Sequence, residues 1–207
     1  MKNHLPTLTL LSLLLLSLGS CDDDTPEVLP HTIIEGQVLE YGTNEPVENA
    51  TVLLYKRIST GAFTGTDMRI DTAITNAAGE YSFQYEDSGK FGLFASADTY
   101  FSTNGIEYSN IRSKKMNTRN ITLDPMALLE LHVKNKNPFD ANDYINVNGT
   151  LSGPWHGKDV DIKTTITVRG NKEEQVSWFI TKNDSSYNQT ELIYCKGHEL
   201  TKYEILY

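Results

Sequence analysis

Apolar and polar residues alternate with a period of two along most of the chain after residue 31, and this pattern constrains the fold more than any other feature. It recurs in segments such as residues 50–55 and 176–180, and turn residues such as 42–46 and 76–79 separate these segments. A period of two puts neighbouring side chains on opposite faces of a strand, whereas an amphipathic helix needs a period near 3.6. Short strands divided by frequent turns are typical of β-sandwiches. We therefore expect an all-β fold of two consecutive antiparallel β-sandwiches.

Residues 1–20 have the pattern of a secretory signal peptide that is removed from the mature protein. Lys2 precedes an apolar run from Leu8 to Leu18, which is too short to cross a bilayer as a helix. The segment Leu18-Gly19-Ser20-Cys21 resembles the bacterial lipobox, in which the chain is cut before a cysteine that carries acyl chains such as palmitate. We therefore expect a lipoprotein anchored through Cys21. The alternative is an ordinary signal peptide that happens to end near a cysteine.

An acidic tether is expected to join Cys21 to the first folded module. It comprises residues 21–31 and begins with Asp22-Asp23-Asp24. An acidic cluster behind a lipidated cysteine resembles the signal that accompanies display on the outer face of the outer membrane in some Gram-negative groups. We expect a lipid-anchored outer-membrane protein exposed at the cell surface, and a periplasm-facing anchor is the alternative. Two or more acyl chains would hold such a protein on the membrane almost irreversibly.

The charge balance argues against nucleic acid as a partner. The chain has 18 Lys and Arg against 27 Asp and Glu, which gives a net charge of −9. Binding to a polyanion requires clustered basic residues that displace counterions, and the basic residues cluster only at 112–115, with Arg119 nearby. We interpret that cluster as a solvated loop. Because Cys21 and Cys195 are the two cysteines, lipidation of the first leaves no disulfide framework.

The first module, residues 32–125, carries a set of short motifs. They are Ile34-x-Gly36-x-Val38, Glu45-Pro46-x-x-x-Ala50-x-Val52, Thr75-Asn76-x-x-Gly79-x-Tyr81-x-Phe83 and Asn120-Ile121-x-Leu123. Together they resemble the carboxypeptidase regulatory-like domain, a transthyretin-like (prealbumin-like) sandwich of seven strands. That architecture is similar to the starch-binding and collagen-adhesin modules of the carbohydrate-binding-like fold. The family more often has Asp at the position of Asn76, and residues 59–71 and 100–118 form longer segments than usual.

The resemblance implies a structural role for the motif residues and no catalytic role. In carboxypeptidases this module accompanies a separate zinc-containing catalytic domain, and nothing after residue 125 is long enough or sufficiently rich in His to be that domain. Gly79 is expected to supply the positive φ of a turn. The last strand of the module, near residues 120–123, is expected to end before Pro125.

Residues 126–207 continue the strand pattern without resembling a known family. We expect about six short strands that form a second sandwich of immunoglobulin-like size. Trp178 alternates with apolar neighbours and is expected in its core. The boundary between the two modules is expected near Pro125, and a single continuous domain is the alternative.

No catalytic site, metal site or cofactor is expected. Cys195-x-x-His198 has a spacing that zinc could use, but structural zinc requires four ligands, so Cys195 is interpreted as a buried apolar residue. The cluster at 140–143 lacks the glycine and the glutamate of a calcium loop and is interpreted as an Asx turn. No nucleophile elbow or local Ser, His and acid set is present in the sequence.

The candidate contact residues are mainly aromatic. Trp155 and His156 lie in a short glycine-containing segment, and an exposed Trp there would stack on sugars or anchor a partner protein. The alternative is that Trp155 folds back to close the end of the sandwich. Tyr100, Phe101 and Tyr108 lie in the long loop expected in the first module, where they would add apolar contacts.

These observations lead us to expect a non-catalytic lipoprotein of the cell envelope that acts as a binding, adhesion or spacer module through its sandwich loops. Its expected partners are the membrane, through the lipid anchor, and either an envelope protein or a glycan. One alternative is a glycan-binding lipoprotein of a polysaccharide uptake system, with Trp155 in the platform. A third hypothesis is a small hydrolase whose site is assembled from distant residues.

Overall fold

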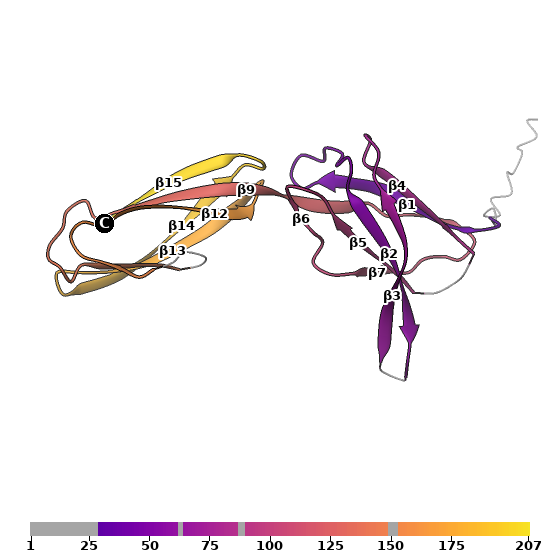
Figure 1. Ribbon diagram of the computed structural model, residues 1–207, viewed down its shortest axis with the longest axis horizontal. Coiled ribbons are helices and arrows are strands. Elements are labelled where there is room, and N and C mark those ends of the chain that lie inside the picture. Colours follow the sequence, from indigo (N-terminus) through magenta and orange to yellow (C-terminus); the bar gives the residue numbers. More distant parts are fainter. Residues whose placement is uncertain (1–28, 62–63, 87–89, 149–152) are drawn as a thin grey trace, which may run out of the picture.

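The protein is an elongated all-β molecule of two lobes arranged end to end (Figure 1). The computed structural model describes residues 29–61, 64–86, 90–148 and 153–207. The predicted all-β sandwich fold is confirmed. The predicted signal peptide, Cys21 and most of the predicted tether lie outside the described residues. Within the described part of the chain, no helix is both long and apolar enough to cross a membrane.

The first lobe contains eight strands and the beginning of a ninth. Their bounds are β1 Thr32–Glu40, β2 Thr51–Ser59, β3 Gly65–Ile74, β4 Glu80–Tyr85, β5 Phe91–Ser96, β6 Tyr100–Phe101, β7 Glu107–Ser109 and β8 Met116–Thr118. One sheet is built on β1, which pairs with β4, β8 and β9, and the other has the order β3-β2-β5-β7. Ile34, Val52 and Phe83 are among the alternating residues that form the core between the sheets.

The turn between β3 and β4 confirms the role predicted for Gly79. Its φ is +72°, and a Cβ at this position would lie 2.6 Å from the carbonyl oxygen of Val38, so a side chain would collide with β1. The side-chain oxygen of Asn76 accepts hydrogen bonds from the backbone amides of Ala78 and Glu80. An Asn at this position therefore supplies the acceptor oxygen that an Asp would supply.

The second lobe contains the rest of β9 and six further strands. Their bounds are β9 Ile121–Lys134, β10 Tyr144–Asn148, β11 Trp155–His156, β12 Asp161–Arg169, β13 Lys172–Lys182, β14 Ser185–Cys195 and β15 Leu200–Leu206. β9 lies between β12 and β15, and the facing sheet has the order β11-β10-β13-β14. Trp178 and Cys195 are 4% and 0% exposed and belong to the core between these sheets, as predicted.

The fourteen-residue strand β9 runs through both lobes (Figure 1). Residues 121–123 pair with β1, and residues 126–134 pair with β12. The prediction that a strand ends before Pro125 is therefore wrong. Neither β1 nor β12 pairs with Pro125, so its missing N–H interrupts neither set of hydrogen bonds. β9 thus makes one sheet of seven strands continuous across the molecule.

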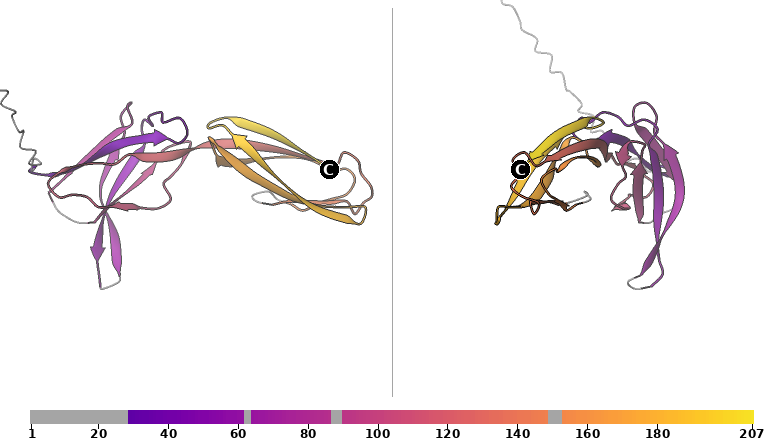
Figure 2. Two further views of the ribbon diagram at one scale, coloured as in Figure 1. Left: turned by 180° about the vertical axis from the view of Figure 1, so that it is seen from behind. Right: turned by 60° about the vertical axis from the view of Figure 1, so that its left-hand side comes forward.

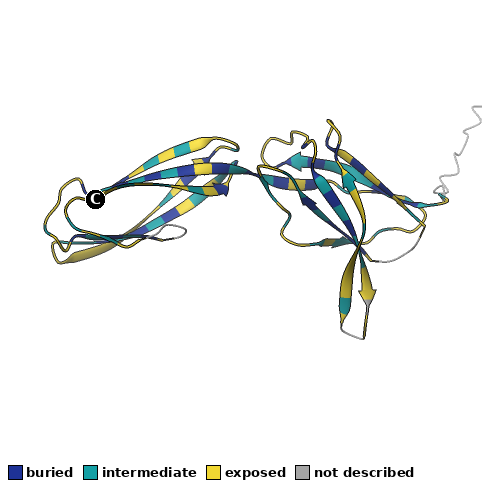
Figure 3. Cartoon of the chain, viewed as in Figure 1, coloured by how far each residue is buried: buried dark blue, intermediate teal, exposed yellow. Residues whose placement is uncertain are grey.

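The pairing is mixed, which differs in detail from the purely antiparallel sheets expected. Among the described strands, β1 pairs in parallel with β8 and β9, and β15 pairs in parallel with β9. Each lobe has its own hydrophobic core, one from Ile34 to Leu123 and the other from Ala127 to Tyr207. Figure 3 shows the alternation of buried and exposed residues along the strands that produces these cores.

The outer half of the β2–β3 hairpin extends away from the body of the first lobe, as the two views of Figure 2 show. Ile58 and Met68 lie on this part of the hairpin and are 41% and 46% exposed. The described part of the segment at residues 59–71, which is longer than usual for the resembled family, therefore lies mostly in this hairpin.

Candidate functional site at the junction of the two lobes

Glu40, the last residue of β1, is buried where the lobes meet. The alternation that buries Ile34 and Val38 also directs Glu40 inward, and its side chain is only 8% exposed. A buried carboxylate is strongly destabilising unless donors compensate for the lost water. The surroundings of Glu40 must therefore supply hydrogen bonds, and they come from both lobes.

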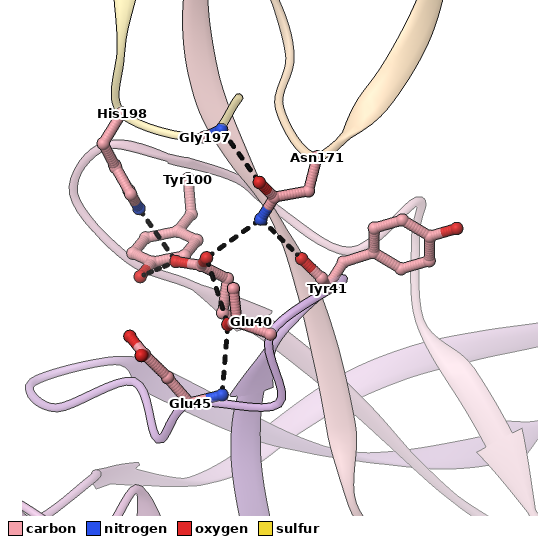
Figure 4. A network of polar contacts seen from close by, with 8 residues as sticks. Glu40, Tyr41, Glu45, Tyr100, Asn171, Gly197 and His198 are labelled. Carbon is pink, nitrogen blue, oxygen red and sulfur yellow. Dashed lines mark hydrogen bonds and ion pairs between the residues drawn. The ribbon is translucent and has the colours of Figure 1, made fainter. Parts of the chain in front are cut away.

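Four side-chain donors surround the Glu40 carboxylate (Figure 4). His198 Nε2 and Tyr100 Oη lie 2.9 and 2.8 Å from Oε2. Asn171 Nδ2 and Thr43 Oγ1 lie 3.0 and 3.2 Å from Oε1. An ionised carboxylate offers about four lone-pair sites, so these donors occupy its accepting capacity. We call these five residues the Glu40 junction.

The charge state of the junction follows from these contacts. Burial opposes ionisation of Glu40, but hydrogen bonds from His198, Tyr100, Asn171 and Thr43 outweigh it and hold the pKa of Glu40 below its ordinary value. Burial, together with the contact to Glu40, raises the pKa of Tyr100 above its ordinary value. A general acid or base works best with a pKa near the operating pH. The pKa of Glu40 and the pKa of Tyr100 are both moved further from neutral pH, which favours a structural role over proton transfer.

Asn171 connects the backbones of two loops from different lobes. It lies in the turn between β12 and β13 with a φ of +56°, a conformation that Asn adopts more readily than most residues. Its Nδ2 also donates to the carbonyl oxygen of Tyr41 at 2.8 Å, and its Oδ1 accepts from the amide of Gly197 at 2.9 Å. One side-chain amide therefore joins the loop after β1 to the turn before β15 (Figure 4).

Gly42 allows the close approach between these loops. A Cβ on Gly42 would lie 2.7 Å from the Cβ of Asn171, and its φ is +89°, which strongly favours glycine. Any larger residue at position 42 would push the loop after β1 away from the turn at Asn171. The sequence Tyr41-Gly42-Thr43 thus supports the geometry of the Glu40 junction.

β9 contributes another carboxylate, that of Asp124, which adds charged contacts around the junction. Asp124 has a side chain that is 16% exposed, and it lies 2.6 Å from Lys172 Nζ and 3.2 Å from Arg169 Nη1. Lys172 Nζ also lies 4.0 Å from the ring centroid of Tyr41, and Arg169 Cζ lies 5.5 Å from that of Phe101. These cation–π contacts also join residues of the two lobes.

The structure places two of the candidate contact residues at this junction. Tyr100 and Phe101 form β6, which pairs with Pro125 and Asp124 of β9. The ring of Tyr100 also makes an edge contact with His198, with 5.0 Å between centroids. The expectation that Tyr100 and Phe101 lie in a loop is therefore wrong, because pairing with β9 makes them a short strand. Their contact with a ligand or partner stays a prediction.

The remaining candidates lie elsewhere. Tyr108 is on β7, which pairs with β5, so the expectation that it lies in a loop is also wrong. Its ring centroid lies 5.6 Å from Arg57 Cζ and 5.2 Å from Lys90 Nζ. Trp155 pairs with core residue Ile145 and packs, partly buried, against the second core, which agrees with the alternative that it closes the sandwich. His156, the next residue on β11, is exposed. Ligand contact by these residues also stays a prediction.

Sequence reasoning missed Glu40 and Asn171. A signal for Glu40 was present, because Glu40 has the same parity as Ile34 and Val38 on one strand. His198 was considered only with Cys195 as a zinc pair. In the structure Cys195 is buried in the core, whereas His198 contacts Glu40. Among the described residues, no group of three or more His, Cys, Asp or Glu side chains is placed to hold a metal ion.

A second buried carboxylate, Asp143, organises the far end of the second lobe. Its side chain is 0% exposed. It accepts hydrogen bonds from Asn135 Nδ2 at 2.8 Å and from the backbone amides of Phe139 and Asp140 at 2.8 and 3.3 Å. Lys182 Nζ lies 4.0 Å away. Burial opposes ionisation, but these hydrogen bonds and the nearby ammonium group hold the pKa of Asp143 below its ordinary value.

The loop before Asp143 has the predicted Asx turn. Asp140 Oδ1 accepts a hydrogen bond from the backbone amide of Asn142 at 2.7 Å. The carboxylates of Asp140 and Asp143 therefore accept hydrogen bonds within the protein, which gives the loop a defined shape.

Comparison with known proteins finds no matching family model and no matching curated protein. Solved structures with low similarity include the Bacillus anthracis TIE protein, 12% identical with a TM-score of 0.41, over 85% of this chain and 34% of that one. They also include a streptococcal ancillary pilin, 11% identical with a TM-score of 0.40, over 84% of this chain and 62% of the pilin.

A DUF3823 family protein from Parabacteroides merdae is 12% identical with a TM-score of 0.32, over 80% of this chain and 99% of that one. The chain covers about a third of the length of the TIE protein and under two thirds of the length of the ancillary pilin. Similarity at this level does not indicate a function.

Proposed function

We propose that the chain is a non-catalytic module of the cell envelope that holds its second lobe in a fixed orientation, away from a membrane tether. The observation that carries this proposal is the Glu40 junction, in which one buried carboxylate accepts hydrogen bonds from two residues of each lobe. Breaking such a contact leaves a charge buried without its partners, which is costly. The junction therefore opposes bending between the lobes.

The continuous strand β9 supports the same proposal. Interlobe motion usually occurs at flexible linkers, but here the connecting segment is a strand paired on both sides of the junction. At about 3.3 Å per residue, its fourteen residues extend about 45 Å. β9 and the Glu40 junction thus resist bending at the same place.

The positions of the strands suggest which end faces outward. β1 begins at the end of the first lobe remote from the junction, and β15 ends at the far end of the second lobe (Figure 1). A lipid anchor at Cys21 would hold the first lobe near the membrane and direct the second lobe away from it. We propose the outer surface of the outer membrane as the location, with the second lobe available to a partner.

The junction gives no support to the hydrolase hypothesis. Glu40 and His198 form a carboxylate–histidine contact, but the donors around Glu40 use its accepting capacity. No lone pair is then left to take a proton from a substrate or a water molecule. The same contacts that stabilise the junction would hinder general base catalysis.

Distance measurements between the lobes test the rigid orientation. Spin labels at Ile74→Cys and Leu206→Cys, both exposed positions on different lobes, should give one narrow distance distribution by double electron–electron resonance. Adding Glu40→Ala should broaden it, whereas adding His132→Ala, a surface change in the second lobe, should leave it narrow. A broad distribution in the parent chain would contradict the proposal.

Membrane fractionation tests the tether. The Cys21→Ala variant should move from the membrane fraction to the soluble fraction, and the matched Cys195→Ala variant should remain with membranes. Retention of Cys21→Ala on membranes would contradict lipidation at that residue. Digestion of the protein by protease added to intact cells would support surface exposure, and protection until the outer membrane is opened would contradict it.

A further inference from the structure

We infer that the outward face of the β11-β10-β13-β14 sheet in the second lobe binds a neutral polysaccharide chain. This inference rests on the proposed function, for which it names the ligand class. The register of the sheet defines the face. Ile145, Trp178 and Ile180 point into the core, so their neighbours on the same strands point outward. We define the neutral face by six outward residues: Tyr144, Asn146, Ser177, Phe179, Asn188 and Thr190.

Aromatic rings at one end of the neutral face line a hollow. Tyr144 makes edge contacts with His156 and Phe179, with 4.9 and 6.0 Å between ring centroids. Together with Ala141, Asn142 and Thr181, these residues line a hollow of about 440 Å³. The hollow is shallow and open to solvent. Aromatic rings bind the C–H face of a pyranose by stacking, as apolar platforms with a polar rim.

The rest of the neutral face carries amides and hydroxyls. Among the described residues, the side-chain amides of Asn146 and Asn188 have no hydrogen-bond partner in the protein. Ser177 Oγ and Thr190 Oγ1 lie 2.9 Å apart across two strands. Amides and hydroxyls both donate and accept hydrogen bonds, as sugar hydroxyls do. The face therefore offers groups that can pair with sugar hydroxyls whatever the direction of each hydrogen bond.

The charge distribution favours a neutral ligand. No Asp, Glu, Lys or Arg points outward on β13 from Gln175 to Thr181 or on β14 from Ser186 to Leu192, although the chain has a net charge of −9. The opposite face of the same lobe is charged, with Lys134 Nζ 2.7 Å from Asp161 and Lys202 Nζ 3.9 Å from Glu130. The neutral face would gain little from a polyanion or a polycation, so an uncharged chain is its best complement.

The hollow is held in shape before any ligand binds. Ala141 and Asn142 lie in the loop fixed by the Asx turn at Asp140 and by the buried Asp143. The other lining residues lie on paired strands. A preformed site loses little conformational freedom on binding, which favours measurable affinity from a shallow surface.

A protein partner fits this face less well. Stable protein interfaces concentrate apolar anchors at their centre and place polar groups around the rim. Here Phe179 has a side-chain amide on each side, because it pairs with Asn146 and Asn188, and the next pair is Ser177 with Thr190. These six residues therefore form no continuous apolar centre. The same reasoning applies to a second copy of this chain.

Affinity electrophoresis of the full mature chain tests the inference. Native gels would contain galactomannan, xyloglucan, amylopectin or mixed-linkage β-glucan as neutral probes, and polygalacturonate as a charged probe. At least one neutral polymer should retard the parent protein, while polygalacturonate should not. Titration calorimetry with an oligosaccharide of the retarding polymer should then show binding at least tenfold weaker in Phe179→Ala and in His156→Ala.

The two variants and a control keep the test decisive. Because Phe179 is half-buried and its loss could disturb folding, the exposed His156 provides the second variant. Tyr187→Ala is the matched control, since Tyr187 is an exposed aromatic residue of β14 that pairs with Ile180 and so lies on the other side of the sheet. Tyr187→Ala should bind like the parent protein.

Three results would overturn the inference: no retardation by any neutral polymer, equal binding by parent and His156→Ala, or self-association that Phe179→Ala abolishes. None of these results affects the interlobe distance or the membrane fractionation. Failure of the glycan ligand is therefore distinguishable from failure of the proposed function.

Discussion

Two buried carboxylates, Glu40 and Asp143, solve the same electrostatic problem in different parts of the molecule. Each is almost inaccessible to water, each accepts at least three hydrogen bonds, and each has its pKa held below the ordinary value. They differ in the origin of their donors. Asp143 is bonded mainly within its own loop, by residues 135, 139 and 140, whereas Glu40 is bonded by residues up to 158 positions away.

The difference shows that one kind of contact can fix either a loop or the relation between two lobes. Loss of the Asp143 contacts should destabilise the second lobe itself. Loss of the Glu40 contacts should leave both cores intact and weaken the coupling between them. Both tryptophans of the chain, Trp155 and Trp178, belong to or pack against the second core, so tryptophan fluorescence reports unfolding of that lobe.

The largest expected effect is that of Asp143→Ala. The change leaves the backbone amides of Phe139 and Asp140 without their acceptor and removes the negative charge 4.0 Å from Lys182 Nζ. Removal of one member of a buried charged cluster costs about 3 kcal/mol. Urea unfolding monitored by tryptophan fluorescence should show this loss in the unfolding free energy of the second lobe. Asp140→Ala, which removes a partly exposed turn acceptor, is the control and should cost about 1 kcal/mol or less. Equal effects of the two changes would contradict the assigned role of Asp143.

Glu40→Ala is expected to have the next largest effect, of a different kind. Four donors lose their acceptor, and we expect a loss of about 2 kcal/mol from the coupling between the lobes. In Glu40→Ala, the unfolding transition measured by circular dichroism should separate from the transition measured by tryptophan fluorescence. In the parent protein these two transitions should lie closer together. If the two signals remain as close in Glu40→Ala as in the parent, the Glu40 junction does not couple the lobes.

Acid should remove both stabilising effects. A carboxyl group whose pKa is lowered in the folded state binds fewer protons there than in the unfolded chain, so stability falls as the pH decreases. For Glu40 and Asp143 the contribution is complete above the ordinary pKa values of 4.5 and 3.8 and is lost as the pH falls through their lower folded values.

The slope of stability against pH measures this loss. It should reach at most about 1.4 kcal/mol per pH unit for each proton taken up. Urea midpoints measured below the ordinary pKa of 4.5 should fall less steeply in Glu40→Gln than in the parent. The same slope in both proteins would mean that the pKa of Glu40 is not lowered by folding.

His198→Ala should cost less than Glu40→Ala. The His198 side chain is 39% exposed, and its removal leaves Glu40 with three other donors. We expect a loss of about 1 kcal/mol, typical of one hydrogen bond to a charged group that retains others. The measurement is the separation between the two unfolding transitions. A loss as large as that of Glu40→Ala would show that His198 alone maintains the junction.

The smallest expected effect is that of His132→Ala. His132 Nε2 lies 2.6 Å from Asp161, a shorter distance than that from His198 to Glu40, but the Asp161 side chain is 50% exposed. Exposed ion pairs contribute little, so we expect at most about 0.5 kcal/mol in the urea unfolding free energy. A larger loss than that of His198→Ala would show that distance, and not burial of the carboxylate, decides the strength of these contacts.

The sequence was sufficient to predict the fold class and several local features. Alternation and turn residues predicted strands, the positive φ of Gly79, the Asx turn at Asp140 and the buried positions of Trp178 and Cys195, because each depends on neighbours within a few residues. The continuity of β9 through Pro125 was missed, since a proline usually ends a strand unless its partners change at that point.

The Glu40 junction could be predicted only in part. Its residues come from four separate segments of the chain, and one sequence does not reveal which turns meet in space. Two signals in the sequence were not used: the parity of Glu40 on its strand, which is consistent with burial, and the pair Gly170-Asn171, which is consistent with a turn. Trp155 and His156 were expected in a short glycine-containing segment, and in the structure they form the strand β11. Neighbours on a strand face opposite sides, so Trp155 is partly buried and His156 is exposed.

The parallel pairing of β9 with β1 and β15 has a mechanical consequence. A pull between residue 32 and residue 206 would draw β1 and β15 in opposite directions along their own axes, with β9 between them. In that geometry the hydrogen bonds of each pair are loaded together, in shear, whereas a pull across the strands would open them one at a time. Tension applied between the two ends of the molecule would therefore load both of these strand pairs in their more resistant direction.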